Sequence, residues 1–135
     1  MAPGVKYLSK KYPFEPKSVG EYIKKRRIDL NLLQREVAVL IGVSEDCITY
    51  WENGRSTPQV QHAPAIISFL GCNPFERPEQ TFGDRVWNYR YRHGLSHKKM
   101  GVKMGVDGST VCSWENNEFM PHSATLKAFE ILVQL

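Results

Sequence analysis

Apolar residues recur every three to four positions through most of the chain, a spacing that predicts helices rather than strands. No segment alternates apolar and polar residues between turn signals, so no sheet is expected. The ranges predicted to be helical are 22–29, 34–41, 45–52, 62–70, 83–92, 96–104, 108–116 and 124–134. The pattern therefore predicts an all-α fold.

Several residues mark where these helices begin and end. Ser44 is placed to cap the helix at 45–52 with its side chain, and Asp107 takes the corresponding place in the second half. The helix at 45–52 ends at Asn53 and Gly54, because glycine accepts the left-handed conformation that follows many helices. Asn117, which also tolerates that conformation, stands where Gly54 stands in the first half.

A frame of forty-one residues occurs twice, at 18–58 and at 81–121, with an offset of 63 and no gap. Ten positions are identical: Gly20/Gly83, Arg27/Arg90, Leu32/Leu95, Val39/Val102, Gly42/Gly105, Val43/Val106, Trp51/Trp114, Glu52/Glu115, Asn53/Asn116 and Pro58/Pro121. Self-similarity at a fixed period indicates a duplicated structural unit. We predict one domain at 18–71 and another at 81–135, with a linker at 72–80 that contains two prolines.

Charge and cysteine content restrict the class of protein. The 135 residues carry a net charge of +4, which slightly favours anionic partners. The three cysteines, Cys47, Cys72 and Cys112, are odd in number and unrelated by the repeat, which argues against a disulfide framework or a zinc site. No apolar run reaches membrane-spanning length, and no nucleophile and base assemble at a recognisable spacing. We expect a soluble cytoplasmic protein that is not an enzyme and needs no metal or cofactor.

A more specific pattern lies within each copy. The segment LLQREVAVLIGVSEDCITYWENGRSTP, at 32–58, combines a short helix, a Gly-Val-Ser turn and a second helix that ends in Trp-Glu-Asn-Gly. It resembles the Cro/repressor type (XRE family) of helix-turn-helix protein, and GLSHKKMGVKMGVDGSTVCSWENNEFMP, at 94–121, resembles it less closely. The resemblance implies tandem lambda-repressor-like domains of four to five short helices each. In such a domain the third helix enters the major groove of DNA.

The resemblance also implies which residues contact double-stranded DNA. They lie at the start of the second helix, on the third helix and just after it. In the first copy they are Gln34, Arg35, Glu45, Asp46, Thr49, Tyr50, Asn53 and Arg55. In the second copy they are His97, Lys98, Gly108, Ser109, Cys112, Ser113 and Asn116, and Glu118 stands in place of Arg55.

Two carboxylates in the first copy depart from a simple DNA-reading surface. Glu45 and Asp46 stand where the third helix approaches DNA, which is itself negatively charged. On one interpretation a carboxylate accepts a hydrogen bond from the amino group of cytosine. On the other, both acids only complement the positive end of the helix dipole. The second copy has small neutral residues there, and Lys98, Lys99 and Lys103 accompany them on its second helix.

Two Arg–Glu pairs recur in the frame and are interpreted as structural rather than catalytic. The pairs are Arg27 with Glu52 and Arg90 with Glu115. Relatives of the family use such a pair as an internal ion bridge between the first helix and the end of the third. We therefore expect removal of one partner to destabilise the fold by leaving a partly buried charge.

The leading hypothesis is a sequence-specific DNA-binding transcriptional regulator, repressor-like, in the bacterial cytoplasm and associated with the nucleoid. The alternative is a protein-interaction or dimerisation module on the same fold, in which the first repeat no longer reads DNA. The basic N-terminal arm at 1–17, with Lys6, Lys10 and Lys11, either follows DNA phosphates or packs partly on the domain. We expect a monomer with two readers or a homodimer, without a small-molecule effector.

Overall fold

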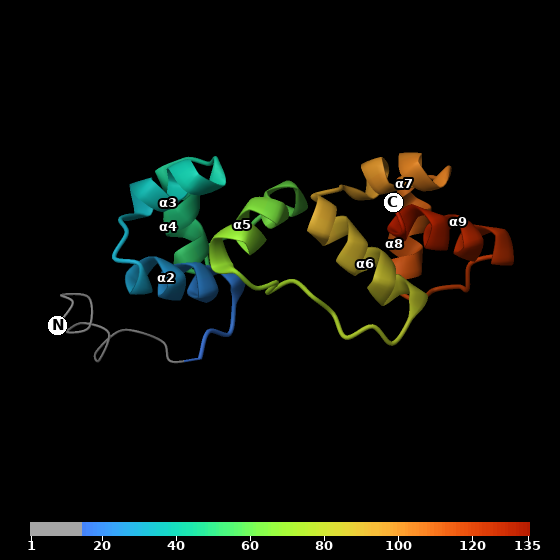
Figure 1. The fold of residues 1–135 in the computed structure, drawn as a ribbon, viewed down its shortest axis with the longest axis horizontal. Helices are drawn as coiled ribbons and strands as arrows, with labels where there is room; N and C mark the ends of the chain where they lie inside the picture. The colour runs from blue at the N-terminus through green and yellow to red at the C-terminus, as the bar shows by residue number, and fades with distance from the viewer. Residues whose placement is uncertain (1–14) are drawn as a thin grey trace. The chain divides into compact units, whose positions relative to one another are not determined.

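The computed structural model describes residues 15–135 (Figure 1). Within this range the secondary structure consists of α-helices and one 3-10 turn, with no strand, so the all-α prediction is confirmed. The chain divides into two compact units, the first ending at Pro74 and the second running from Phe75 to Leu135. Of the arm predicted at 1–17, only the last three residues belong to the described range.

Within residues 15–74, the first unit contains four α-helices and the 3-10 turn, coloured blue to green in Figure 1. They are α2 (Val19–Asp29), α3 (Gln34–Ile41), α4 (Glu45–Glu52), η1 (Val60–His62) and α5 (Ala63–Leu70). Ser44 caps α4 as predicted, because its hydroxyl accepts a hydrogen bond from the N–H of Cys47. Gly42, with φ of 87°, ends α3 in the left-handed conformation and allows the sharp turn into α4.

A small apolar core holds these helices together. Ile23 of α2, Val37 of α3, Ile48 of α4 and Ile66 of α5 are all 0% exposed. Burial of each such side chain stabilises the fold by about 1.5–3 kcal/mol. Since every helix contributes one of these residues, the core fixes α3 and α4 against the scaffold formed by α2 and α5.

The second unit contains four helices, coloured yellow to red in Figure 1. They are α6 (Phe82–His93), α7 (His97–Met104), α8 (Gly108–Glu115) and α9 (Ser123–Val133). The bounds of α7 and α8 are those of α3 and α4 shifted by 63 residues. Its core comprises Val86, Met100, Val111, Trp114 and Phe129. Repeated sequence positions thus form corresponding helices in both units.

One of the ten identical positions, Gly20/Gly83, is a glycine that allows helices to approach closely in both units. A Cβ atom on Gly20 would lie 1.7 Å from the carbonyl oxygen of Trp51, at the end of α4. A Cβ atom on Gly83 would lie 2.1 Å from the carbonyl oxygen of Trp114, at the end of α8. Both distances are far below van der Waals contact, so any larger residue would push the first helix of the unit away from the third.

One predicted cap differs between the two units. Asp107 occupies the extended N-cap position of α8, but its side chain makes no capping hydrogen bond. The equivalence with Ser44 therefore holds for backbone position and not for side-chain chemistry. Asn117 has φ of 58°, which confirms that it takes the left-handed place of Gly54.

Phe75 and Arg77, which lie within the linker predicted at 72–80, pack on α6. The indole N–H of Trp87 donates to the carbonyl oxygen of Phe75 at 2.9 Å. The fully buried amide of Asn88 accepts from the N–H of Arg77 at 2.8 Å and donates to its carbonyl oxygen at 2.9 Å. The guanidinium of Arg77 also lies 3.8 Å from the centre of the Trp87 ring. A polar residue in an amphipathic helix gives no sequence signal for this role.

Candidate nucleic-acid interface

The structure brings Arg27 and Glu52 together as a bidentate ion pair. Nε of Arg27 donates to Oε2 of Glu52 at 2.7 Å, and Nη2 donates to Oε1 at 2.8 Å. The remaining Nη1 donates to the carbonyl oxygen of Leu32, between α2 and α3. The side chain of Glu52 is only 2% exposed. The pair therefore ties the end of α4 to α2 and to the loop before α3.

Gln34, the first residue of α3, is held by the same carboxylate. Its Nε2 donates to Oε1 of Glu52 at 3.0 Å, and its Oε1 accepts from the hydroxyl of Thr49 at 2.9 Å. An amide nitrogen carries two N–H groups, so one remains for an external acceptor. Thr49 is half-buried, and its hydroxyl faces Gln34 within the unit. The start of α3 is therefore fixed against α4 by polar contacts as well as by the core.

The second unit has the same bridge in a more enclosed form. Nε and Nη2 of Arg90 donate to the two carboxylate oxygens of Glu115 at 2.6 and 3.0 Å. His97, which stands at the position of Gln34, places Nε2 3.0 Å from Oε1 of Glu115. Because Glu115 is ion-paired and can only accept, we assign the proton of this contact to Nε2 of His97. A histidine thus replaces the glutamine without losing the bond to the buried carboxylate.

The outer side of α4 carries side chains that are free to contact another molecule. Glu45 and Asp46 are exposed in its first turn. Tyr50 is 43% exposed, and the guanidinium of Arg55 lies 5.4 Å from the centre of its ring. The N–H of Arg55 also donates to the carbonyl oxygen of Tyr50 at 2.9 Å. Asn53 is the exposed C-cap residue of α4.

The corresponding side of α8 carries shorter side chains. Ser109 is exposed, whereas Cys112 and Ser113 are half-buried. The exposed Asn116 places Nδ2 3.6 Å from Sγ of Cys112. Gly108 packs on α7, since a Cβ atom there would lie 3.1 Å from the backbone nitrogen of Lys98. At this position the second unit has a glycine that packs closely on α7, whereas the first unit has the long side chain of Glu45.

The second helix of each unit exposes a different set of charges. Three of the equivalent pairs of exposed residues differ between the units: Arg35/Lys98, Glu36/Lys99 and Leu40/Lys103. Glu36 also accepts a hydrogen bond from the N–H of Leu33 at 2.8 Å, which ties its carboxylate to the start of α3. Lys99 and Lys103 extend the candidate interface beyond the residues assigned by resemblance. Their signal in the sequence is the concentration of positive charge in the second copy.

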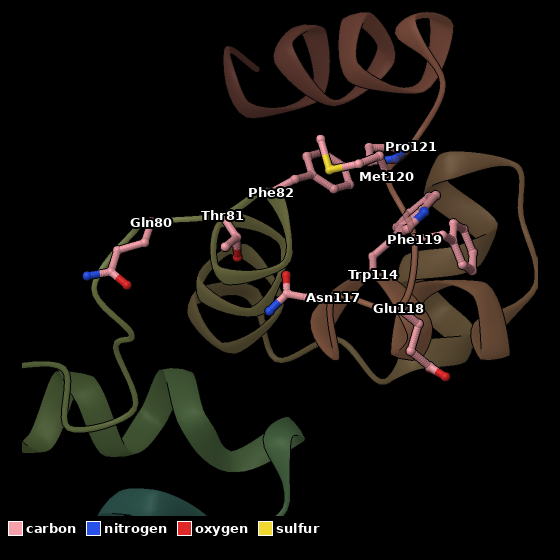
Figure 2. A pocket seen from close by; sticks show the side chains of 9 residues that line it. All are labelled: Gln80, Thr81, Phe82, Trp114, Asn117, Glu118, Phe119, Met120 and Pro121. Atoms are coloured by element: carbon pink, nitrogen blue, oxygen red, sulfur yellow. The ribbon is translucent and has the colours of Figure 1, made fainter.

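A pocket of about 670 Å³ opens beside the loop that follows α8 (Figure 2). Its apolar lining comes from Phe82, Trp114, Phe119, Met120 and Pro121. The loop places Glu118, Phe119 and Met120 where the first unit has Arg55, Ser56 and Thr57. Phe119 and Met120 are 51% and 80% exposed. This loop therefore lacks the positive charge that Arg55 supplies in the first unit.

Metal-binding clusters and membrane-spanning helices are both absent from the described residues. From residue 15 to residue 135, no group of three or more His, Cys, Asp or Glu side chains is arranged to hold a metal ion. No helix in that same range combines the length and apolar character needed to cross a membrane. The candidate functional residues are the exposed polar side chains on α3 and α4 in the first unit and, separately, on α7 and α8 in the second.

Comparison with known proteins identifies the class of the first unit. Residues 23–76 match the family model described as "Helix-turn-helix". A segment of 57 residues is 39% identical to the type II methyltransferase M1.ScrFI of Lactococcus lactis subsp. cremoris, over 40% of this chain and 15% of that protein. A segment of the same length is 33% identical to the HTH-type transcriptional regulator DicA of Escherichia coli (strain K12), over 42% of each. No solved structure gives a significant match. The first unit is therefore similar to helix-turn-helix proteins over residues 23–76, and the chain spans less than half the length of these two relatives.

Proposed function

We propose that this chain is a sequence-specific, double-stranded DNA-binding transcriptional regulator of the repressor type. The observation that carries the proposal is the helix-turn-helix formed by α3, Gly42 and α4, over which the family match extends. The outer side of α4 would contact base edges through its exposed side chains, Glu45, Asp46 and Tyr50. Arg35 and Arg55, both exposed, are the phosphate contacts of this unit.

The second unit is, on this proposal, a second DNA reader. Its α7 and α8 have the bounds of α3 and α4 at the repeat offset, and Arg90 and Glu115 repeat the ion bridge of the first unit. His97 and Lys98 stand at the phosphate-contacting start of α7, and Ser109 and Ser113 lie on α8. Two readers in one chain raise the effective concentration of each for its half-site, so a monomer can occupy a direct repeat.

One of the two relatives supports a regulatory role. DicA is named as a transcriptional regulator, and the match covers 42% of its length. The match to the methyltransferase covers only 15% of that protein, so we do not carry its enzymatic activity over to this chain. A chain that binds DNA in this way acts in the bacterial cytoplasm at the nucleoid, without a cofactor, a small-molecule effector or a membrane.

The proposal is tested by selecting sequences from a random duplex library and measuring affinity for the winners at several salt concentrations. We expect an enriched motif and an affinity that falls linearly with the logarithm of salt concentration, because lysine and arginine displace counterions from phosphate. Absence of binding at low salt, or binding without a salt slope, would contradict the proposal.

A second candidate function is a protein-interaction unit on the same fold, in which the first unit does not bind DNA. The observation that favours it is the exposed acidic start of α4, formed by Glu45 and Asp46. Arg35→Ala and Lys98→Ala occupy equivalent positions in the two units and discriminate between the candidates. If both units read DNA, each of the two substitutions should weaken DNA binding. If only Lys98→Ala does so, the first unit is not a DNA reader and the second candidate is favoured.

A further inference from the structure

Equivalent exposed positions of the two units differ strongly in charge. Helix α3 of the first unit has one basic, one acidic and one apolar residue at three exposed positions where α7 of the second unit has lysines. The equivalent pairs are Arg35/Lys98, Glu36/Lys99 and Leu40/Lys103. No ion pair or side-chain hydrogen bond engages the lysine ammonium groups within the described residues. The three positions are therefore neutral overall on α3 and carry three positive charges on α7.

Equivalent positions on the third helix differ in side-chain reach. The first unit presents Glu45 and Asp46, both exposed, in the first turn of α4. The second unit has Gly108 and Ser109 there. A Cβ atom on Gly108 would make a tight contact with the backbone nitrogen of Lys98, at 3.1 Å, so a side chain there would require α7 to shift slightly. The second unit therefore has no side chain at one of the positions from which the first unit reaches outward.

From these differences we infer that the two units divide the recognition of DNA. The second unit binds phosphates through Lys98, Lys99 and Lys103 and contributes most of the affinity. The first unit discriminates bases through Glu45 and Asp46, which accept hydrogen bonds from the amino groups of cytosine. The inference rests on the proposed function and names the contribution that each unit makes to it.

The chemistry of the contacts supports this division. Lysine binds phosphate as a point charge without reading sequence, and each neutralised phosphate adds to the salt dependence. A serine hydroxyl both donates and accepts, so Ser109 discriminates poorly among bases. A carboxylate only accepts, which selects an amino group and rejects bases that present acceptors alone. Repulsion between Glu45 or Asp46 and phosphate weakens the first unit, and the covalent link to a lysine-rich unit compensates for that loss.

One test measures the contribution of the lysines in the full chain. The triple variant Lys98→Ala/Lys99→Ala/Lys103→Ala should bind the selected duplex more weakly at low salt. Its salt slope should be smaller by up to about 2.7, since each phosphate contact contributes about 0.9. Its selected motif should remain that of the wild type. The matched control removes exposed Lys127 of α9 and should change neither quantity.

The second test measures base discrimination with side chains of nearly unchanged size. Glu45→Gln/Asp46→Asn should shift the preference at the contacted positions from cytosine toward adenine, because amides pair with adenine. It should also raise affinity at low salt by removing two negative charges. An unchanged motif in this variant, or an altered motif or an unchanged salt slope in the lysine variant, would overturn the division. If the wild type binds no duplex at low salt, the proposed function itself fails.

Discussion

Arg90 and Glu115 form a bidentate ion pair whose side chains are only 4% and 3% exposed. Arg27 of the equivalent pair in the first unit is 16% exposed, and its partner Glu52 is 2% exposed. In the first unit the pair connects α2 to the end of α4, and in the second it connects α6 to the end of α8. Each carboxylate also binds the first residue of the helix between them, α3 or α7. The bridge therefore sets the geometry of the proposed DNA-reading surface in each unit.

Removing the carboxylate of this bridge should destabilise either unit. Glu115→Ala leaves Arg90 buried without a counter-charge, and breaking a buried pair in this way costs about 3–5 kcal/mol. Glu52→Ala should have a smaller effect, because Arg27 can still reach water. Thermal unfolding followed by circular dichroism measures both effects.

The control for this measurement is the exposed pair of Lys25 and Asp29, whose side chains are 38% and 42% exposed. Asp29→Ala should change stability by no more than about 0.5 kcal/mol, as is usual for exposed pairs one helical turn apart. A melting curve of Glu115→Ala that coincides with the wild-type curve would show that the bridge does not stabilise the fold.

Substitution of Gly83 by alanine should destabilise the second unit despite the better helix propensity of alanine. The propensity gain is about 1 kcal/mol. The added Cβ would lie 2.1 Å from the carbonyl oxygen of Trp114, a backbone atom that moves only if α8 moves. We expect a net loss of about 1–3 kcal/mol, as for other overpacked sites. Lys127→Ala, at an exposed position on α9, is the control in the same thermal melt. A net gain for Gly83→Ala would refute the close approach.

The two units offer a natural exchange at His97. His97→Gln should retain stability, because Gln34 makes the equivalent bond to Glu52 in the first unit. His97→Ala should lower stability by about 1 kcal/mol, since the carboxylate of Glu115 then has one donor fewer but keeps both bonds from Arg90. Urea unfolding of the two variants makes the comparison. Equal stability of the wild type and the alanine variant would show that the His97 bond contributes nothing.

Acid should weaken the start of α6 through Asp84. Burial alone would raise the pKa of this carboxyl, but hydrogen bonds from Gln80 and Thr81 and the charge of Arg77 outweigh it, so the pKa lies below its ordinary value of 3.8. A lowered pKa in the folded state stabilises the fold above the unfolded-state value, about 3.9, and this contribution disappears as pH falls through the folded-state value.

The measurement compares wild type with Asp84→Asn by urea unfolding between about pH 6 and pH 2, the interval that spans titration of the carboxyl. The advantage of the wild type should be constant in the upper part of this range and should decline below about pH 4. A difference between the two proteins that stays the same at every pH would contradict the assignment.

Much of the fold could be predicted because the relevant signals are local. Apolar spacing predicts a helix at 34–41, and the structure has Gln34–Ile41. Capping by Ser44 and the left-handed conformation of Asn117 are also confirmed, since each depends on neighbouring backbone. The repeat adds the expectation of equivalent helices, which the bounds of α7 and α8 satisfy.

Contacts between distant residues could not be predicted in the same way. The bonds of Gln34 to Glu52 and Thr49 join positions 18 and 15 residues apart, and no local pattern specifies them. In the sequence, Phe75 and Arg77 look like linker residues. Their contacts with Trp87 and Asn88 form only once α6 has folded, so no local pattern predicts them. The DNA contacts assigned to both units remain predictions.

The amino-acid sequence by itself determined the helices, their turns and the duplication of the frame, because these follow from residue spacing and from the backbone preferences of glycine, serine and asparagine. Tertiary structure decided which polar side chains are used internally and which remain free. Thr49 is turned toward Gln34, whereas Glu45 and Asp46 are exposed. The physical reason is that hydrogen bonds to a buried carboxylate require helices to pack first, and only the side chains left outside that packing can bind a partner.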